Sequence, residues 1–169
     1  MENIHEKPEA TEISETPNAE KPIADIAVLG MMIGDMRYLA RMSEISEVIP
    51  VAEIVPVPLT HSWFLGIINV HGNLYGITDL GAYLGGTAVP FDSRSRILLV
   101  SADYKINSGF IVHNLMGIRS LSEFAVCPTC NEQLRAGVSH IYQDKEGRTW
   151  YELDLRTFVR EKRFLQIAS

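Results

Sequence analysis

The chain of 169 residues is long enough for one domain or for two small halves that share a core, and 46% hydrophobic residues suit a globular protein. The formal net charge is −6 and most of it lies within residues 1–22, so the remainder is close to neutral and a basic nucleic-acid-binding face is disfavoured. No apolar run approaches the roughly 20 residues of a membrane span, and the acidic start differs from a secretory signal. Two cysteines cannot staple a domain of this size, which favours a cytoplasmic location.

Residues 1–22 are expected to form a disordered acidic tail. They contain six glutamates, two lysines, three prolines and no aromatic residue. Such a segment cannot bury enough apolar area to offset the entropy lost on ordering it. A solvated leader is the simplest interpretation, and an interaction arm is the functional alternative. The folded domain is therefore expected to cover residues 23–169.

The first folded stretch predicts a β-hairpin. IADIAVLGMMIG is rich in apolar and β-branched residues, and Gly34-Asp35 is a turn signal before MRYLARMSEISEVIPV. From Arg41 onward the apolar spacing fits one helical turn or a bulged strand, and propensity does not decide between them. Three prolines at positions 50, 56 and 58 then mark an extended loop or a sheet edge.

The central stretch FLGIINVHGNLYGITDLGAYLG predicts a second hairpin followed by a short helix. We expect strands over residues 64–70 and 74–78, with a turn at residues 71–73 between them. Asp79 is placed to cap a helical turn that Gly85-Gly86 ends. The apolar stripes are expected to face the core: Ile67, Ile68, Leu74, Ile77 and residues 97–100.

The second half again predicts short strands. RILLVSA and SGFIVHNLMGI each predict one strand, with a turn at residues 107–109, and residues 119–135 are irregular. VSHIYQ and TWYEL predict a hairpin across residues 144–147. Asp154 can cap a final helix, LRTFVREKRFLQ, that buries Leu155, Phe158, Val159 and the stem of Lys162. Many short strands with a single clear helix favour an all-β barrel or a pair of barrels over a parallel α/β sheet.

No nucleotide-binding or hydrolase motif is present. GxxxxGK[ST], GxGxxG, the nucleophile elbow and HExxH are all absent. The histidines are scattered, and Asp79, the carboxylate near His71 in the sequence, is better explained as a helix cap. No coherent set of acid, base and nucleophile is expected.

Cys127-Pro128-Thr129-Cys130 is the most suggestive local motif. One CxxC supplies two thiolates, whereas tetrahedral zinc needs four ligands, and a thioredoxin-like motif needs a βαβ setting that is missing here. The simplest interpretation is a loop with two incidental thiols. The functional alternative is a small metal- or redox-responsive regulatory protein that uses Cys127 and Cys130.

Three stretches resemble the CheW family of chemosensory coupling proteins. IGDMRYLARMSEISEVI resembles the first hairpin of the family, and FLGIINVHGNLYGITDL resembles its central signature, an aliphatic-Gly pair before an Asn-x-x-Gly turn and a strand ending in Asp-Leu. SGFIVHNLMGIRSL resembles the later strand and turn. The likeness runs from about residue 26 to residue 165. SWFLGIINVHGNLYGITDLGAYLG and LMGIRSLSEF are most similar to the PilI branch, which serves type IV pilus (twitching motility) systems.

The resemblance implies an all-β, CheW-like fold of two packed five-stranded SH3-like β-barrel subdomains with a C-terminal helix. It implies a non-catalytic adaptor without metal or cofactor in a chemosensory two-component pathway. Such adaptors join the cytoplasmic tip of a methyl-accepting chemoreceptor to the regulatory domain of a CheA-type histidine kinase. They are cytoplasmic, reach membrane receptor arrays through their partners, and neither bind nucleic acid nor insert into the membrane.

The resemblance also assigns partner contacts to three places. Carried over by position, they are Ile45, Glu47 and Val48; Asn69, Val70, His71 and Gly72; and Ile111, Val112, His113 and Asn114. The family usually has arginine where His71 stands and often an acidic residue where His113 stands. Because histidine carries only a partial, pH-dependent charge, either the partner surface differs here or this contact is weaker.

Overall fold

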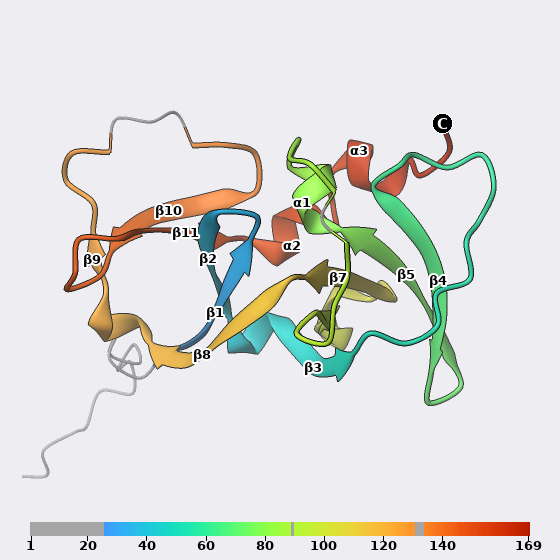
Figure 1. Cartoon of the computed structure of the whole chain (residues 1–169), viewed down its shortest axis with the longest axis horizontal. Helices are drawn as coiled ribbons and strands as arrows, with labels where there is room; N and C mark the ends of the chain where they lie inside the picture. The colour runs from blue at the N-terminus through green and yellow to red at the C-terminus, as the bar shows by residue number, and fades with distance from the viewer. Residues whose placement is uncertain (1–25, 89, 131–133) are drawn as a thin grey trace, which may run out of the picture.

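The computed structural model describes residues 26–88, 90–130 and 134–169, so the tail expected over residues 1–22 lies outside the described residues. The chain forms two sheets of short strands, which are the left and right halves of the molecule in Figure 1. The expected all-β fold in two packed halves is confirmed. The sheets contain six and five strands rather than five each, because a two-residue strand extends the first.

The first sheet is built from both ends of the described chain. Its strands are, in spatial order, β8 (Asn114–Ser120), β1 (Ala27–Ile33), β2 (Met36–Arg41), β11 (Thr149–Leu153), β10 (Val138–Gln143) and β9 (Ala125–Val126). Neighbours are antiparallel, except that β2 and β11 pair in parallel. The predicted hairpin turns at Gly34-Asp35 and at residues 144–147 join β1 to β2 and β10 to β11.

The second sheet comes from one continuous stretch of chain. Its strands are, in spatial order, β3 (Ile45–Pro50), β6 (Arg96–Val100), β7 (Ser108–Val112), β5 (Asn73–Asp79) and β4 (Phe64–Val70). Only β5 and β7 pair in parallel within it. Asp79 caps the short helix α1 (Leu80–Tyr83) as predicted, because its Oδ1 accepts a hydrogen bond from the Ala82 amide at 3.1 Å.

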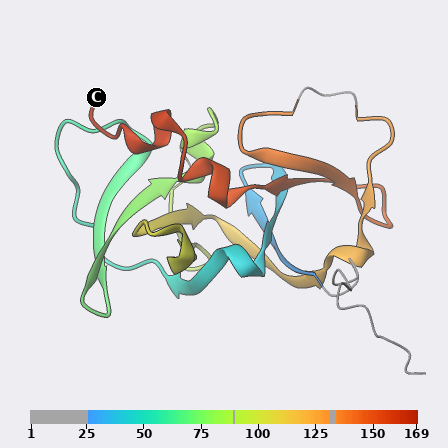
Figure 2. The ribbon, with the colours of Figure 1, turned by 180° about the vertical axis from the view of Figure 1, so that it is seen from behind.

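The chain crosses between the two halves at three points. The 3₁₀ helix η2 (Met42–Glu44) leads from β2 to β3, His113 leads from β7 to β8, and Asp154 follows β11. Figure 2 shows the C-terminal segment running from the first half across to the second. SGFIVHNLMGI was expected to be one strand, but the structure divides it at His113 into strands of different sheets. The turn expected at residues 107–109 is also displaced, since β7 already begins at Ser108.

The final helix is divided as well. Asp154 caps it as predicted, but α2 (Leu155–Phe158) and α3 (Lys162–Leu165) are separate turns because Glu161 is extended, with φ −64° and ψ 134°. The break turns Phe164 into the core in place of the Lys162 stem. No helix in the described part of the chain is long and apolar enough to cross a membrane.

One apolar layer is shared by the two halves. It combines residues of both sheets with aromatic rings of the helices, and two smaller clusters lie within the individual halves. The ring centroids of Trp63 and Tyr83 lie 5.0 Å apart, and those of Phe110 and Phe164 lie 5.5 Å apart. Edge-to-face and tilted pairs at these separations add to the stability gained from burial.

Gly66 provides a test of how the loop after β3 is held against β4. Val55 and Ile67 exchange two backbone hydrogen bonds of 2.9 Å, and a Cβ at Gly66, whose φ is 138°, would overlap the Val55 carbonyl. We expect Gly66→Ala to lower the free energy of unfolding by about 3 kcal/mol in a urea titration, since backbone atoms must move. Gly147→Ala, at φ 77° in open space, should cost about 1 kcal/mol. Equal losses would contradict this account.

Candidate functional site

Two segments that are distant in the sequence meet on the five-stranded half. His71 Nε2 and Glu47 Oε1 lie 3.4 Å apart, although β3 and β4 are the opposite edges of the sheet. They can meet only because the sheet curls until its edges approach each other, as in a small barrel. Two of the three places assigned to partner contacts therefore form one surface. We call it the Glu47–His71 surface and define it as Glu47, Asn69, His71, Gly72 and Leu74.

The turn between β4 and β5 presents the imidazole to solvent. His71 and Gly72 have positive φ, 52° and 85°, which is the pattern of a type I′ hairpin turn. Asn69 Oδ1 accepts a hydrogen bond from the Gly72 amide at 3.0 Å and so fixes the turn. The His71 side chain is 77% exposed and that of Glu47 is 43% exposed, so both remain accessible to a partner.

Leu74 supplies an apolar part of this surface. It was expected in the core but is 57% exposed, and it pairs across the hairpin with the exposed Asn69. Successive strand residues face opposite sides, so Leu74 and the buried Ile77, three positions apart, cannot share a face. Ile45 and Val70, also assigned to contacts, are buried: Ile45 belongs to the layer shared by the two halves and Val70 to the cluster inside the five-stranded half.

The third place assigned to partner contacts, residues 111–114, is less exposed than the other two. Ile111 and Val112 are 0% exposed in β7, which is flanked by β5 and β6, so both pack inside the fold. The partner contact expected for them stays a prediction. All five residues of β7 are buried, whereas a half-exposed strand would alternate. His113 and Asn114 are partly exposed at the crossing between the sheets, and His113 lies against α1: a Cβ on Gly81 would be 3.6 Å from its Cε1.

A buried carboxylate occupies a polar pocket of about 360 Å³ beside β2, β10 and β11. Glu152 accepts hydrogen bonds from Arg41 Nε at 2.6 Å and Tyr142 Oη at 3.1 Å, and His140 Nδ1 lies 3.1 Å away. Burial and the adjacent Glu152 raise the pKa of Tyr142 to about 12, so it stays protonated. Within the described ranges no hydroxyl or thiol is hydrogen-bonded to the second His140 nitrogen. The donors of Arg41 and Tyr142 thus compensate the buried charge of Glu152.

The two cysteines are bonded to each other. Cys127 and Cys130, whose Cα atoms are 5.6 Å apart, form a disulfide, which corrects the expectation of two incidental thiols. Three positions of sequence separation leave the Cα atoms within the range that a disulfide spans. In the part of the chain that the structure describes, no group of three or more His, Cys, Asp or Glu side chains is placed to hold a metal ion. The alternative of a metal-responsive regulator gains no support from this geometry.

A family model for the CheW-like domain matches residues 27–163. The chain belongs to the CheW-like domain family. The family resemblance inferred from the three sequence stretches is thereby confirmed, and the fold is the one that it implied.

Individual relatives of this CheW-like chain are distant. Protein PilI of Pseudomonas aeruginosa is 27% identical over 103 residues, which cover 61% of this chain and 57% of that protein. Chemotaxis protein CheV3 of Helicobacter pylori is 21% identical over 161 residues, covering 89% and 51%. Chemotaxis protein CheW of Thermotoga maritima is 24% identical over 102 residues, covering 60% and 66%. The matches thus cover about half to two thirds of the length of these curated relatives.

Among solved structures, the crystal structure of scaffolding protein TtCheW from Thermoanaerobacter tengcongensis is similar. The TM-score is 0.68 at 19% identity, over 84% of this chain and 97% of that one. At this identity the likeness demonstrates the shared fold. Sequence reasoning had already suggested Glu47 and His71 separately, but it missed their contact because it considered only carboxylates close to His71 in the chain. The curling of the sheet supplies the missing information.

The Glu152 cluster can be tested as a structural element. Glu152→Ala removes the acceptor of the buried Tyr142 hydroxyl and the partner of Arg41, which is 38% exposed and can be hydrated, so we expect the free energy of unfolding to fall by about 2–3 kcal/mol. The matched control is Glu146→Ala: Glu146 is 69% exposed and pairs with Arg148 at 2.9 Å, so its loss should cost about 0–1 kcal/mol. Urea titrations of both variants provide the measurement. A loss for Glu152→Ala no larger than the control's would show that the buried carboxylate is not needed for stability.

Proposed function

We propose that this chain is a non-catalytic adaptor that couples methyl-accepting chemoreceptors to a CheA-type histidine kinase. The match of the CheW-like family model to residues 27–163 is the observation that carries the proposal. The exposed Glu47–His71 surface supports it, because it offers polar and apolar groups without a nucleophile. The adaptor would act inside the cell, at the cytoplasmic tip of the receptors.

The Glu47–His71 surface has the chemistry of a modest protein interface. Leu74 offers an exposed aliphatic group, while Glu47 and His71 offer an acid and an imidazole beside it. A few anchors of this kind dominate the energy of typical interfaces, and surrounding polar groups set orientation. Weak contacts to a receptor and a kinase can then combine through avidity in an array.

We further infer that the pathway controls type IV pili and twitching motility. The 27% identity to Protein PilI of Pseudomonas aeruginosa over 103 residues supports this assignment. The stretches around Trp63 and Arg119 that resemble the PilI branch point the same way. Calorimetric titration of this chain against the regulatory domain of each CheA-type kinase of the same cell tests the assignment, which requires tightest binding to the kinase of the pilus system.

Substitution of His71 tests the contact surface itself. An aspartate tolerates the positive φ of this position, so His71→Asp should keep the fold while placing like charge beside Glu47. We expect binding of the kinase regulatory domain to weaken about tenfold, or 1.4 kcal/mol. His71→Arg, which introduces a fixed positive charge, should bind as tightly as the original chain or more tightly. Isothermal calorimetry measures both.

The control for this experiment is His61→Asp. His61 is also exposed, but it stacks on Trp63 at 5.4 Å and lies outside the Glu47–His71 surface. Its replacement should leave kinase binding unchanged. If His71→Asp and His61→Asp bind alike, the turn is not part of the kinase contact, and the same titration with a receptor tip fragment then decides whether it contacts the receptor.

A further inference from the structure

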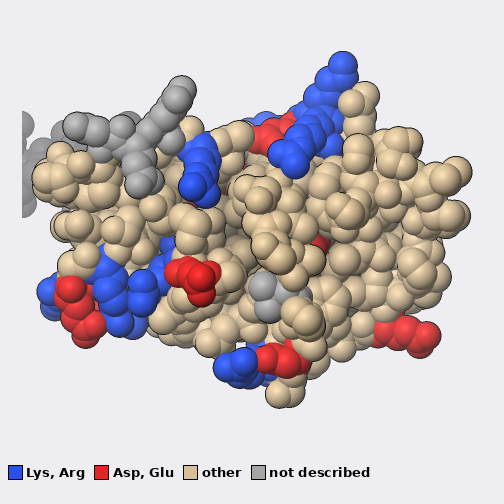
Figure 3. All heavy atoms as spheres, turned by 45° about the horizontal axis from the view of Figure 1, so that its top comes forward, with Lys and Arg blue, Asp and Glu red and all other residues tan. Residues whose placement is uncertain are grey.

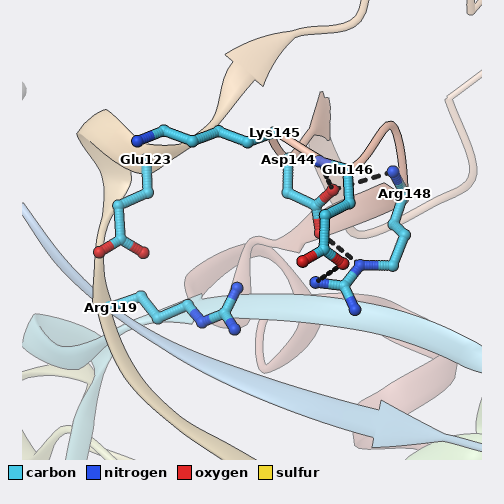
Figure 4. A pocket seen from close by; sticks show the side chains of 6 residues that line it. All are labelled: Arg119, Glu123, Asp144, Lys145, Glu146 and Arg148. Carbon is cyan, nitrogen blue, oxygen red and sulfur yellow. Dashed lines mark hydrogen bonds and ion pairs between the residues drawn. The ribbon is translucent and has the colours of Figure 1, made fainter.

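Charged groups at the end of the six-stranded half neutralise one another. A polar pocket of about 370 Å³ there is lined by three acidic and three basic side chains: Arg119, Glu123, Asp144, Lys145, Glu146 and Arg148 (Figure 4). Arg148 contacts Asp144 at 2.7 Å and Glu146 at 2.9 Å. Figure 3 shows that charged side chains on one face of the molecule gather in small groups of both signs, separated by wide uncharged areas. The pocket therefore has no excess charge to attract an ionic ligand.

The disulfide between Cys127 and Cys130 is a chemical group of the same half that the adaptor function does not use. Cys127 directly follows β9, and its amide donates a hydrogen bond of 3.0 Å to the Ile141 carbonyl of β10. The sheet thus holds one end of the disulfide. A bridge across three positions of sequence restrains the unfolded chain far less than one that closes a long loop, so stapling of the fold does not explain it.

The location proposed for the adaptor makes this bridge chemically informative. Inside the cell disulfides are rare, and those that form are usually transient and catalytic or redox-sensing. Reduction of a disulfide starts with the attack of a thiolate on one of its sulfurs. Cys127 is buried, with 9% of its surface exposed, whereas Cys130 is partly exposed. Cys130 is therefore the expected point of attack, and Cys127 carries the sulfur that leaves.

Thr129 is placed to assist the leaving sulfur. Its Oγ1 lies 3.9 Å from Cys127 Sγ, and because a disulfide sulfur carries no proton, the hydroxyl is the donor. The same hydroxyl can donate to the Cys127 thiolate once the bridge opens, which stabilises the leaving group. In the described part of the chain no lysine or arginine side chain is hydrogen-bonded to either sulfur, so the Thr129 hydroxyl has this role alone.

We propose that the Cys127–Cys130 disulfide exchanges reversibly with a dithiol protein of the thioredoxin class. A thiolate of the partner attacks Cys130 Sγ, the bond between the two cysteines breaks, and its electron pair leaves with Cys127 Sγ, which takes up a proton. The second thiol of the partner then attacks the partner's sulfur in the mixed disulfide and releases Cys130, which is protonated in turn. The pair thereby gains two electrons and two protons, and the partner is oxidised to its own disulfide.

Equilibration of the full-length protein with thioredoxin tests the proposal. The chain is mixed with several ratios of reduced to oxidised thioredoxin, and its free thiols are then alkylated and counted by mass spectrometry. We expect the dithiol-to-disulfide ratio of the chain to lie within about tenfold of that of thioredoxin. A chain that stays fully oxidised or fully reduced across the whole range of ratios would overturn the proposal. The inference rests on the proposed intracellular adaptor function, but the kinase is absent from this assay, so the two can fail separately.

Single-cysteine variants test the point of attack. Cys127→Ser leaves the partly exposed Cys130, and Cys130→Ser leaves the buried Cys127. We expect the thiol of Cys127→Ser to form a mixed disulfide with oxidised glutathione about tenfold faster than the thiol of Cys130→Ser. Urea titrations check that both variants are folded. Equal rates, or a faster reaction of Cys130→Ser, would overturn the assignment of Cys130 as the attacked sulfur.

Thr129→Val tests the leaving group with both cysteines in place. The substitution keeps the shape of the side chain but removes the hydroxyl, so reduction by dithiothreitol should be about tenfold slower, whereas Thr129→Ser should keep the original rate. The control is Thr60→Val, which removes a hydroxyl bonded to the Val57 carbonyl in the other half and should leave the rate unchanged. Equal rates for Thr129→Val and Thr60→Val would overturn the role of Thr129.

Discussion

Burial of a single apolar layer between the two sheets is the interaction on which the rest of the structure depends. Phe110 from β7 meets Phe158 and Phe164, which the chain delivers only after it has completed the other sheet and crossed back. Removing either half would expose this layer to water, because residues of both sheets form it. The three crossings of the chain between the halves are therefore held in place by the core that they create.

That layer also determines where contact groups can stand. Sheet residues that face it are buried, as Phe110 and Val112 are, so exposed groups are found mainly at strand edges and turns. The Glu47–His71 surface uses both, an edge strand and a two-residue turn, on a half whose interior is closed by Ile68, Val70 and Ile77. A rigid scaffold beneath short exposed segments is the usual basis for recognition by loops.

Local chemistry was enough to predict much of the fold. The turns at residues 34–35, 71–72 and 144–147 and the caps Asp79 and Asp154 depend on residues within four positions of one another, and the sequence shows them directly. Features that depend on distant partners were not predictable in this way. Nothing local marks His113 as the point where a strand changes sheets, or Glu161 as the point where a helix ends.

In the candidate site, too, local features were predictable from the sequence and long-range contacts were not. Family resemblance singled out the segments of Glu47 and His71 separately, whereas their proximity follows from the curvature of a whole sheet. The exposure of Leu74 was predicted wrongly because its apolar residue type was considered without its position in the strand. Its side chain lies on the opposite face of β5 from the buried Ile77 and is 57% exposed. Ile111 and Val112 are buried on opposite faces of a central strand, and the sequence shows this as an unbroken apolar run without alternation.

In the sequence, all strands of the second sheet lie between β2 and β8 of the first sheet, and this order has a consequence for biosynthesis. Arg41 of β2 and its partner Glu152 are separated by 111 positions, so at ribosomal rates the N-terminal hairpin waits roughly 6–20 s for the strand that pairs with it. All strands of the five-stranded half are translated during that interval. At that stage the five-stranded half still lacks Phe158 and Phe164 on its apolar layer, so the last third of the chain to be made must complete both halves.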